Sequence, residues 1–216
     1  MPAVIIPLKE RSKLSPPAED RYRKCLGEAA WFRLPDSVRR RFSKRLGEAE
    51  QTIYRGEVAA MELSRWGWLL AQAGRMLGAP LPFTRDALGP CVVVVTESAA
   101  LGGQIWSRSY PRPGRFPQVV HSAKRFAGPS GIEEYLGRGL VMRLALEEEA
   151  GQMIFRSAGF AIEVAGRTLR VPDWLIPLRC TVIHRAETDA RFSFTLIVEN
   201  AVLGRLVHQV AFFQDA

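Results

Sequence analysis

The chain has 216 residues, of which 47% are hydrophobic and 24% charged, a composition typical of a globular protein with a sizeable core. The formal net charge of +8 is concentrated near the N-terminus, where residues 1–47 hold twelve Lys and Arg against five Asp and Glu. No apolar run approaches the ~20 residues of a membrane-spanning helix, and residues 4–6 are too short for a signal-peptide core, so we expect a cytoplasmic protein. The three cysteines lie too far apart for a disulfide framework or a zinc site.

The N-terminal region is predicted to be an arm followed by helices. Residues 1–17 contain four prolines, which favour an extended arm, and residues 18–216 are predicted to form one α+β domain. One helix is expected from about residue 18 to Pro35, and a second begins at Asp36 and ends at Gly47.

The second of these helices is strongly basic. Arg39, Arg40 and Arg41 follow one another on it, so it could bind an anionic surface or an acidic partner. The alternative is a solvated helix face without a partner.

A third helix is expected after a strand or hairpin at residues 48–63, which Gly56 interrupts. Ser64 is a suitable N-cap, and Gly78 and Pro80 end the helix. Its apolar residues recur at helical spacing: Trp66, Leu69, Leu70, Ala73, Met76 and Leu77. Such a stripe favours packing against the core, with a lid over a cavity as the alternative.

The second half of the chain alternates apolar and polar residues with period two, which indicates strands with one packed face. Turn residues such as Ala165-Gly166 separate these stretches. Strands are predicted at residues 91–98, 104–110, 118–126, 139–149, 152–164, 167–171, 178–186, 191–199 and 204–213, with a single helical turn at 130–136. We therefore predict an α+β fold, with N-terminal helices packed on a strongly curved antiparallel sheet that forms a half-barrel or barrel of about eight or nine strands.

A candidate ligand-binding face lies on the strand at residues 104–110. Trp106, Arg108 and Tyr110 share one face of this strand. An aromatic ring, a guanidinium and a phenol are costly to bury without partners, so this face either meets water or lines a polar and aromatic pocket.

Further candidates lie on the next strand and in a later loop. His121 and Lys124 occupy opposite faces of the strand at 118–126, so one of them should face Trp106. Trp174 lies between Pro172 and Pro177, in a stiff apolar connection suited to the rim of a cavity. The predicted ligand-binding residues are Trp106, Arg108, Tyr110, His121, Lys124 and Trp174.

Motifs for cofactors and catalysis are absent from the sequence. There is no phosphate-binding glycine loop, no dinucleotide fingerprint and no nucleophile elbow, and no histidine has a second ligand at metal-binding spacing. We expect no cofactor, no metal and no specific binding of nucleic acid.

Several short segments of the chain resemble a bacterial family of domains of unknown function, number 4166. The segments are residues 103–108, 121–124, 139–140, 170–175, 192–194 and 203–205, and the resemblance covers roughly residues 32–213. It implies a domain that stands alone or is attached to NAD(P)-binding oxidoreductase domains, and it implies no activity.

Taken together, these features predict a non-enzymatic domain that binds a small apolar or amphiphilic molecule, including an anionic, lipid-like one. One alternative is an isomerase-like or cyclase-like enzyme that uses His121 as general base. Another is an interaction module that docks through its basic N-terminal helices.

Overall fold

The computed structural model describes residues 21–47, 50–78, 80–85 and 87–215 of the chain. The predicted arm at residues 1–17 and the predicted helix start near residue 18 lie outside these residues.

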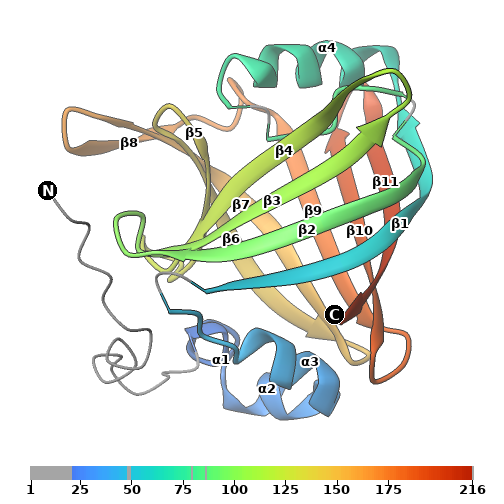
Figure 1. Ribbon diagram of the computed structural model, residues 1–216. Coiled ribbons are helices and arrows are strands. Elements are labelled where there is room, and N and C mark those ends of the chain that lie inside the picture. The colour runs from blue at the N-terminus through green and yellow to red at the C-terminus, as the bar shows by residue number, and fades with distance from the viewer. Residues whose placement is uncertain (1–20, 48–49, 79, 86, 216) are drawn as a thin grey trace, which may run out of the picture.

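A closed antiparallel barrel of ten strands dominates the structure (Figure 1). The strands are β1 (Gln51–Leu63), β2 (Gly89–Ser98), β3 (Gly103–Arg112), β4 (Arg115–Arg125), β5 (Glu133–Gly137), β6 (Leu140–Glu149), β7 (Gln152–Val164), β8 (Arg167–Val171), β9 (Leu178–Ala186), β10 (Arg191–Asn200) and β11 (Gly204–Asp215). Their order is β6-β5-β4-β3-β2-β1-β11-β10-β9-β7, and the hairpin pairing of β6 with β7 closes the ring. β8 pairs with β7 outside the ring.

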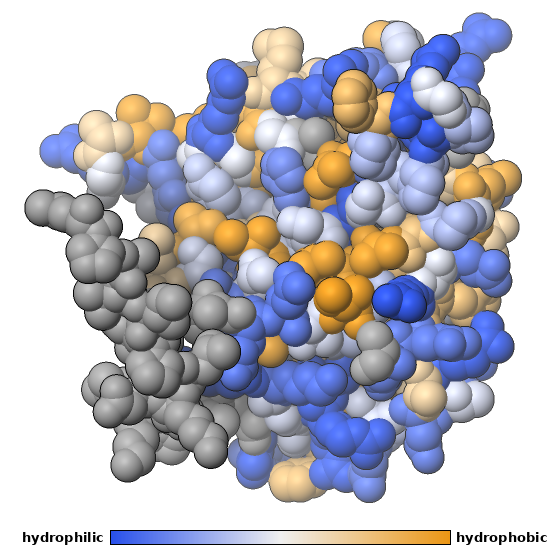
Figure 2. Space-filling model, in the orientation of Figure 1, coloured by the Kyte–Doolittle hydropathy of each residue, from blue (hydrophilic) through white to orange (hydrophobic). Residues whose placement is uncertain are grey.

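The period-two pattern of the sequence sets the two faces of the barrel wall. In β2, Cys91, Val93 and Val95 point inward and are buried, while Val92 and Val94 are half-buried on the outside. The outer wall is therefore not uniformly polar. Figure 2 shows hydrophobic side chains over the middle of the wall, surrounded by hydrophilic ones.

Helices cover both ends of the barrel (Figure 1). α1 (Arg21–Leu26), α2 (Glu28–Arg33) and α3 (Asp36–Phe42) lie at one end, and α4 (Arg65–Arg75) lies across the other. The ring of Tyr22 meets the rings of Phe42 and Phe126 edge-on, each at 4.9 Å between centroids, so the first three helices contribute to the core. The predicted helix before Pro35 is divided into α1 and α2 at Gly27, whose φ of 86° favours glycine.

The predicted strand count of eight or nine was too low, for two reasons. Residues 51–63 form one continuous strand with a bulge, because Gly56 lets the strand approach β11 closely instead of breaking it. A Cβ atom at Gly56 would lie 2.0 Å from the carbonyl oxygen of Phe212. The predicted helical turn at 130–136 was wrong, since Glu133, Glu134 and Tyr135 pair with β4 as the short strand β5.

The apolar stripe of α4 divides between two environments. Leu70, Ala73 and Leu77 line the cavity, and Ala73 also reaches the surface, whereas Trp66 and Met76 are exposed and do not line it. Core packing was therefore the wrong interpretation for the exposed part of this stripe, and α4 covers a cavity.

Candidate functional site

A cavity of about 490 Å³ lies inside the barrel beneath α4. Its lining is mostly aliphatic and aromatic, because it is made by the inward residues of the strands. Representative apolar residues are Leu70, Leu81, Val120, Met142, Phe160 and Leu196. Such a space suits the apolar part of a ligand.

The mouth of the cavity lies between α4 and the connection from β8 to β9. Ala73 on α4 and Leu175 and Pro177 in the connection line the cavity, and all three are exposed to solvent. Residues that belong both to the cavity and to the surface mark where a molecule can enter.

A polar cluster interrupts the apolar lining on β4 and β5. Lys124 Nζ donates to Glu134 Oε2 at 2.7 Å, and the Ser122 hydroxyl donates to Oε1 of the same carboxylate. All three residues are buried. Burial raises the pKa of Glu134, but the charges of Lys124 and Arg108 and the two hydrogen bonds outweigh that effect, so its pKa lies below the ordinary value. Glu134 is therefore ionised, and its pair with Lys124 is a true ion pair.

Arg108 lies beside this cluster on β3. Its Nη1 atom donates to Ser122 Oγ at 3.4 Å, a long contact. Among the residues that the structure describes, no carboxylate forms an ion pair with Arg108. A guanidinium in a cavity wall with one weak partner has donors available for an anion.

Two further buried polar groups in the lining lack partners. Trp106 Nε1 and Gln209 Nε2 form no hydrogen bond within the described part of the chain. Gln209 Oε1 accepts from the Tyr110 hydroxyl at 3.4 Å, and turning the amide over would leave its oxygen unpaired instead. Burial raises the pKa of Tyr110, so its hydroxyl stays protonated and neutral.

Four of the six predicted ligand-binding residues line the cavity: Trp106, Arg108, Tyr110 and Lys124. The strand register explains the grouping, since Trp106 pairs with Ser122 and Gln104 pairs with Lys124. The inward set of β4 is thus the one that contains Lys124.

The other two predicted residues lie elsewhere. His121 pairs with Ser107 on the outer wall and is exposed, so it cannot act as a general base inside the cavity. The interpretation of His121 as a catalytic base was wrong for this reason. Trp174 is adjacent to the mouth but is 75% exposed and does not line the cavity.

Sequence reasoning did not place Ser122, Glu134 or Gln209 in the site. Ser122 lies two residues before Lys124 and shares the inward face of β4 with it, so the period-two pattern of the sequence could have placed Ser122 in the site. Glu134 was assigned to a helical turn, and a run of two glutamates gives no sign of which one faces inward.

A separate buried cluster closes the opposite end of the barrel. Arg41 from α3 forms an ion pair with Asp215, with Nη2 and Oδ2 2.8 Å apart, and its guanidinium lies 3.9 Å from the Phe192 ring centroid. Its Nη1 atom is 3.3 Å from His184 Nε2. Burial and Arg41 lower the pKa of His184 to about 3, so this imidazole is neutral.

This arrangement corrects the prediction for Arg41 on the basic helix. Of the three arginines proposed to meet an anionic surface or an acidic partner, Arg41 is buried and paired, and Arg39 forms an ion pair with Asp36. Arg40 is the exposed member of the three.

No group of three or more His, Cys, Asp or Glu side chains in the described ranges could hold a metal ion. Cys180 lines the cavity, and burial raises the pKa of its thiol to about 12, so it is protonated and not a reactive thiolate. Within the same residues, no helix is both long enough and apolar enough to cross a membrane.

A known protein family matches most of the chain. The family described as "Domain of unknown function (DUF4166)" matches residues 34–213, a span that contains every residue lining the cavity. The chain belongs to this family. The resemblance noted in the sequence is thereby confirmed, and the DUF4166 domain is, in this chain, a ten-stranded barrel with an internal cavity.

One curated protein shows a weaker similarity. The large ribosomal subunit protein uL16 of Agathobacter rectalis is 25% identical over 97 residues, which are 45% of this chain and 60% of that protein. An identity this low over part of each chain carries no function over to the DUF4166 domain.

Proposed function

We propose that the barrel binds a small amphiphile with one negative charge, whose head contacts Arg108 and whose apolar part fills the cavity. The observation that carries this proposal is the guanidinium of Arg108, which lies in the cavity wall without an ion-pair partner among the described residues. Arg108 is half-buried, and the nearby Glu134 carboxylate is already paired with Lys124, so an anionic ligand would gain charge-assisted hydrogen bonds from the remaining donors of the guanidinium.

The charge balance of the lining supports the same class of ligand. The ionisable residues that line the cavity are Arg108, Lys124, Glu134, Tyr110 and Cys180. The pKa values of Tyr110 and Cys180 are raised, so both are neutral. Two cations and one carboxylate leave one positive charge, which matches a single anionic head.

The unpaired donors extend this head-binding region. Trp106 Nε1 and Gln209 Nε2 are buried polar atoms on residues that line the cavity. A ligand oxygen that accepted a hydrogen bond from either one would remove the cost of an unsatisfied buried donor. The remaining lining is apolar, and each methylene buried there contributes about 0.8 kcal/mol.

The test compares three ten-carbon ligands: decanoate, decanol and decyltrimethylammonium. Isothermal titration calorimetry below their aggregation concentrations should show that decanoate binds most tightly. Arg108→Gln should weaken decanoate binding by about 10–100-fold, since a charge-assisted hydrogen bond contributes about 1.5–3 kcal/mol, and should leave decanol unaffected.

The matched control is Arg191→Gln, which removes an exposed arginine at the start of β10, outside the cavity lining. It should bind decanoate like the original protein. Equal affinity for decanoate and decanol, or an Arg108→Gln variant with unchanged decanoate affinity, would refute an anion-binding role for Arg108.

A further inference from the structure

The α4 end of the barrel carries an unusual concentration of exposed apolar side chains. On α4 and at its C-cap, Trp66 is 56% exposed, and Leu69 and Met76 are also exposed, although their spacing places them on or beside the stripe of Leu70 and Ala73 that lines the cavity. A helix that covers a barrel normally buries its large apolar side chains, so several that stay exposed along this stripe indicate a second contact.

Two loops extend this apolar surface. Trp174 and Leu175 are exposed in the connection between β8 and β9, and Val202 and Leu203 are exposed in the turn between β10 and β11. The loops are joined, because Asn200 Nδ2 donates to the Pro177 carbonyl at 3.0 Å.

The turn also lies next to the start of α4. Ser64 at the N-cap of α4 donates its backbone N–H to the carbonyl of Leu206, near the start of β11. The three segments therefore form one surface, which we call the mouth rim, made of Trp66, Leu69, Met76, Trp174, Leu175, Val202 and Leu203.

The mouth rim is continuous with the cavity. Leu175 belongs to both, because it is exposed and also lines the cavity. Ala73, two positions before Arg75 on α4, marks the other side of the same opening.

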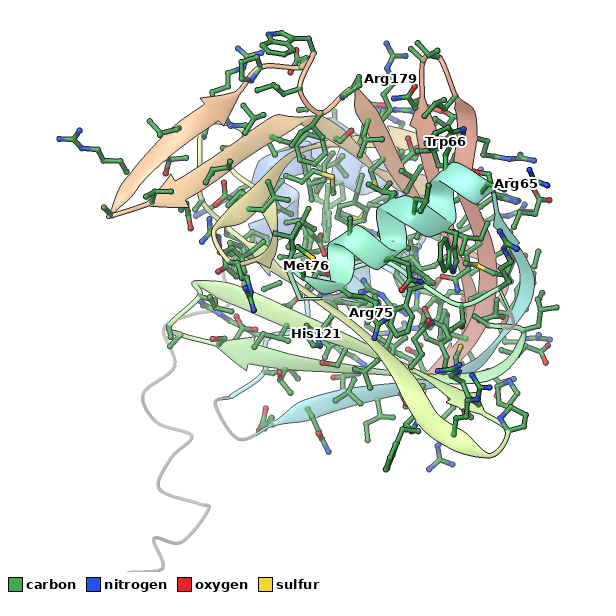
Figure 3. All side chains as sticks on the ribbon, turned by 90° about the horizontal axis from the view of Figure 1, so that it is seen from above. Arg65, Trp66, Arg75, Met76, His121 and Arg179 are labelled. Carbon is green, nitrogen blue, oxygen red and sulfur yellow. The ribbon has the colours of Figure 1, made fainter. Side chains whose placement is uncertain are left out.

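Several arginines lie beside the mouth rim. Arg65, Arg75 and Arg179 lie around α4 when this end is viewed from above (Figure 3), and none of them forms an ion pair with a described residue. The negative charges of two nearby carboxylates are balanced by other arginines, since Glu62 pairs with Arg205 and Asp173 pairs with Arg170. Residues 62–76, 170–179 and 199–205 together hold five arginines and three carboxylates, so this end carries a net positive charge.

We propose that the mouth rim docks on the surface of an anionic lipid bilayer, with the opening of the cavity toward the membrane. Tryptophan is suited to the interface between lipid and water, the aliphatic side chains would enter the acyl boundary, and the three arginines, of which Arg75 donates to Gln72, would meet anionic headgroups. The surface is made from one helix and two loops around the opening of the cavity. This inference goes beyond the proposed function, because bilayer binding requires no ligand in the cavity.

Co-sedimentation with vesicles tests the proposal. The full chain should bind vesicles of phosphatidylcholine with 30% phosphatidylglycerol and should not bind vesicles of phosphatidylcholine alone. Binding to the anionic vesicles should weaken as salt is added. Changing Arg65, Arg75 and Arg179 to Gln should weaken it by about fivefold for each arginine.

The apolar contribution is tested with Trp66→Ala/Trp174→Ala, which should lower vesicle binding by at least about tenfold, because both side chains would leave the interface. The matched control is Phe32→Ala on α2, at the opposite end of the barrel, where Phe32 is 58% exposed. Phe32→Ala and Arg40→Gln should bind vesicles like the original chain.

Three results would overturn the proposal. The first is no binding of the full chain to anionic vesicles. The second is a loss of vesicle binding in Phe32→Ala as large as that in Trp66→Ala/Trp174→Ala. The third is unchanged vesicle binding by Trp66→Ala/Trp174→Ala. Thermal unfolding of each variant shows that it is folded, and decanoate binding by calorimetry reports separately on the cavity.

Discussion

Lys124 and Glu134 face each other across β4 and β5 and form a buried ion pair, with Nζ and Oε2 2.7 Å apart. The pair joins the shortest barrel strand to its neighbour and lies in the wall of the cavity. The pair therefore links β5 to the barrel wall and occupies the Glu134 carboxylate, which leaves Arg108 as the cation proposed to bind the ligand.

Removing one member of this pair should be more harmful than removing both. Lys124→Met would leave a buried carboxylate without its ion-pair partner, and we expect a loss of about 3–5 kcal/mol in the free energy of unfolding. Lys124→Met/Glu134→Met should recover most of this loss. Urea unfolding measures both, and a single variant as stable as the original chain would contradict a stabilising role for Lys124.

Arg41 and Arg40 should differ sharply although they are neighbours. Arg41→Gln removes the buried ion pair with Asp215 and the contact with Phe192, so we expect it to cost about 3–5 kcal/mol. Arg40→Gln, at an exposed position, should stay within about 0.5 kcal/mol of the original chain. Chemical unfolding of the two variants compares them directly, and equal stabilities would contradict the buried position of Arg41.

His184 should make the domain sensitive to mild acid. Its pKa is lowered to about 3 in the folded state, mainly by burial, while the unfolded chain takes up the proton near pH 6.5. The unfolded state therefore binds more protons below pH 6.5, and stability is present above that pH and is lost as the pH falls toward 3. Between pH 6.5 and pH 5 we expect a loss of about 2 kcal/mol.

The variant His184→Gln separates this effect from other titrations. It should flatten the dependence of unfolding free energy on pH between 6.5 and 5, whatever its stability at pH 7. A slope that persists in the variant would assign the effect to another group.

The two glycines of α4 should respond in opposite ways to substitution by alanine. A Cβ atom at Gly67 would lie 2.0 Å from the carbonyl oxygen of Leu206, so Gly67→Ala must displace the helix from β11 and should be strongly destabilising. At Gly74 the nearest atom, Cδ of Pro80, would be 3.5 Å away, an ordinary contact. Gly74→Ala should therefore stabilise the helix by about 0.5–1 kcal/mol, which thermal unfolding would detect.

Much of the barrel could be predicted from sequence because strand alternation is a local signal. That Trp106, Arg108 and Tyr110 share one face follows from period two alone, whereas their inward position is seen only in the structure. Closure was not predictable in the same way, since it depends on β5, a five-residue strand whose two glutamates do not resemble a core strand.

Other features depend on contacts between distant residues. Nothing local distinguishes Arg41 from Arg39 and Arg40, and only the approach of Asp215 at the end of the chain makes the third arginine a core residue. The residues of the α4 stripe share one helical spacing but not one environment, so the spacing could not show that Trp66 is exposed.

β8 stands apart from the ring and, within the described chain, pairs only with β7. An unpaired strand edge can recruit a strand from another molecule, which is a common route to aggregation. In β8 this edge is short and carries the exposed arginines Arg167 and Arg170. Arg170 pairs with Asp173, so Arg167 supplies the charge that would oppose two copies approaching edge to edge at this strand.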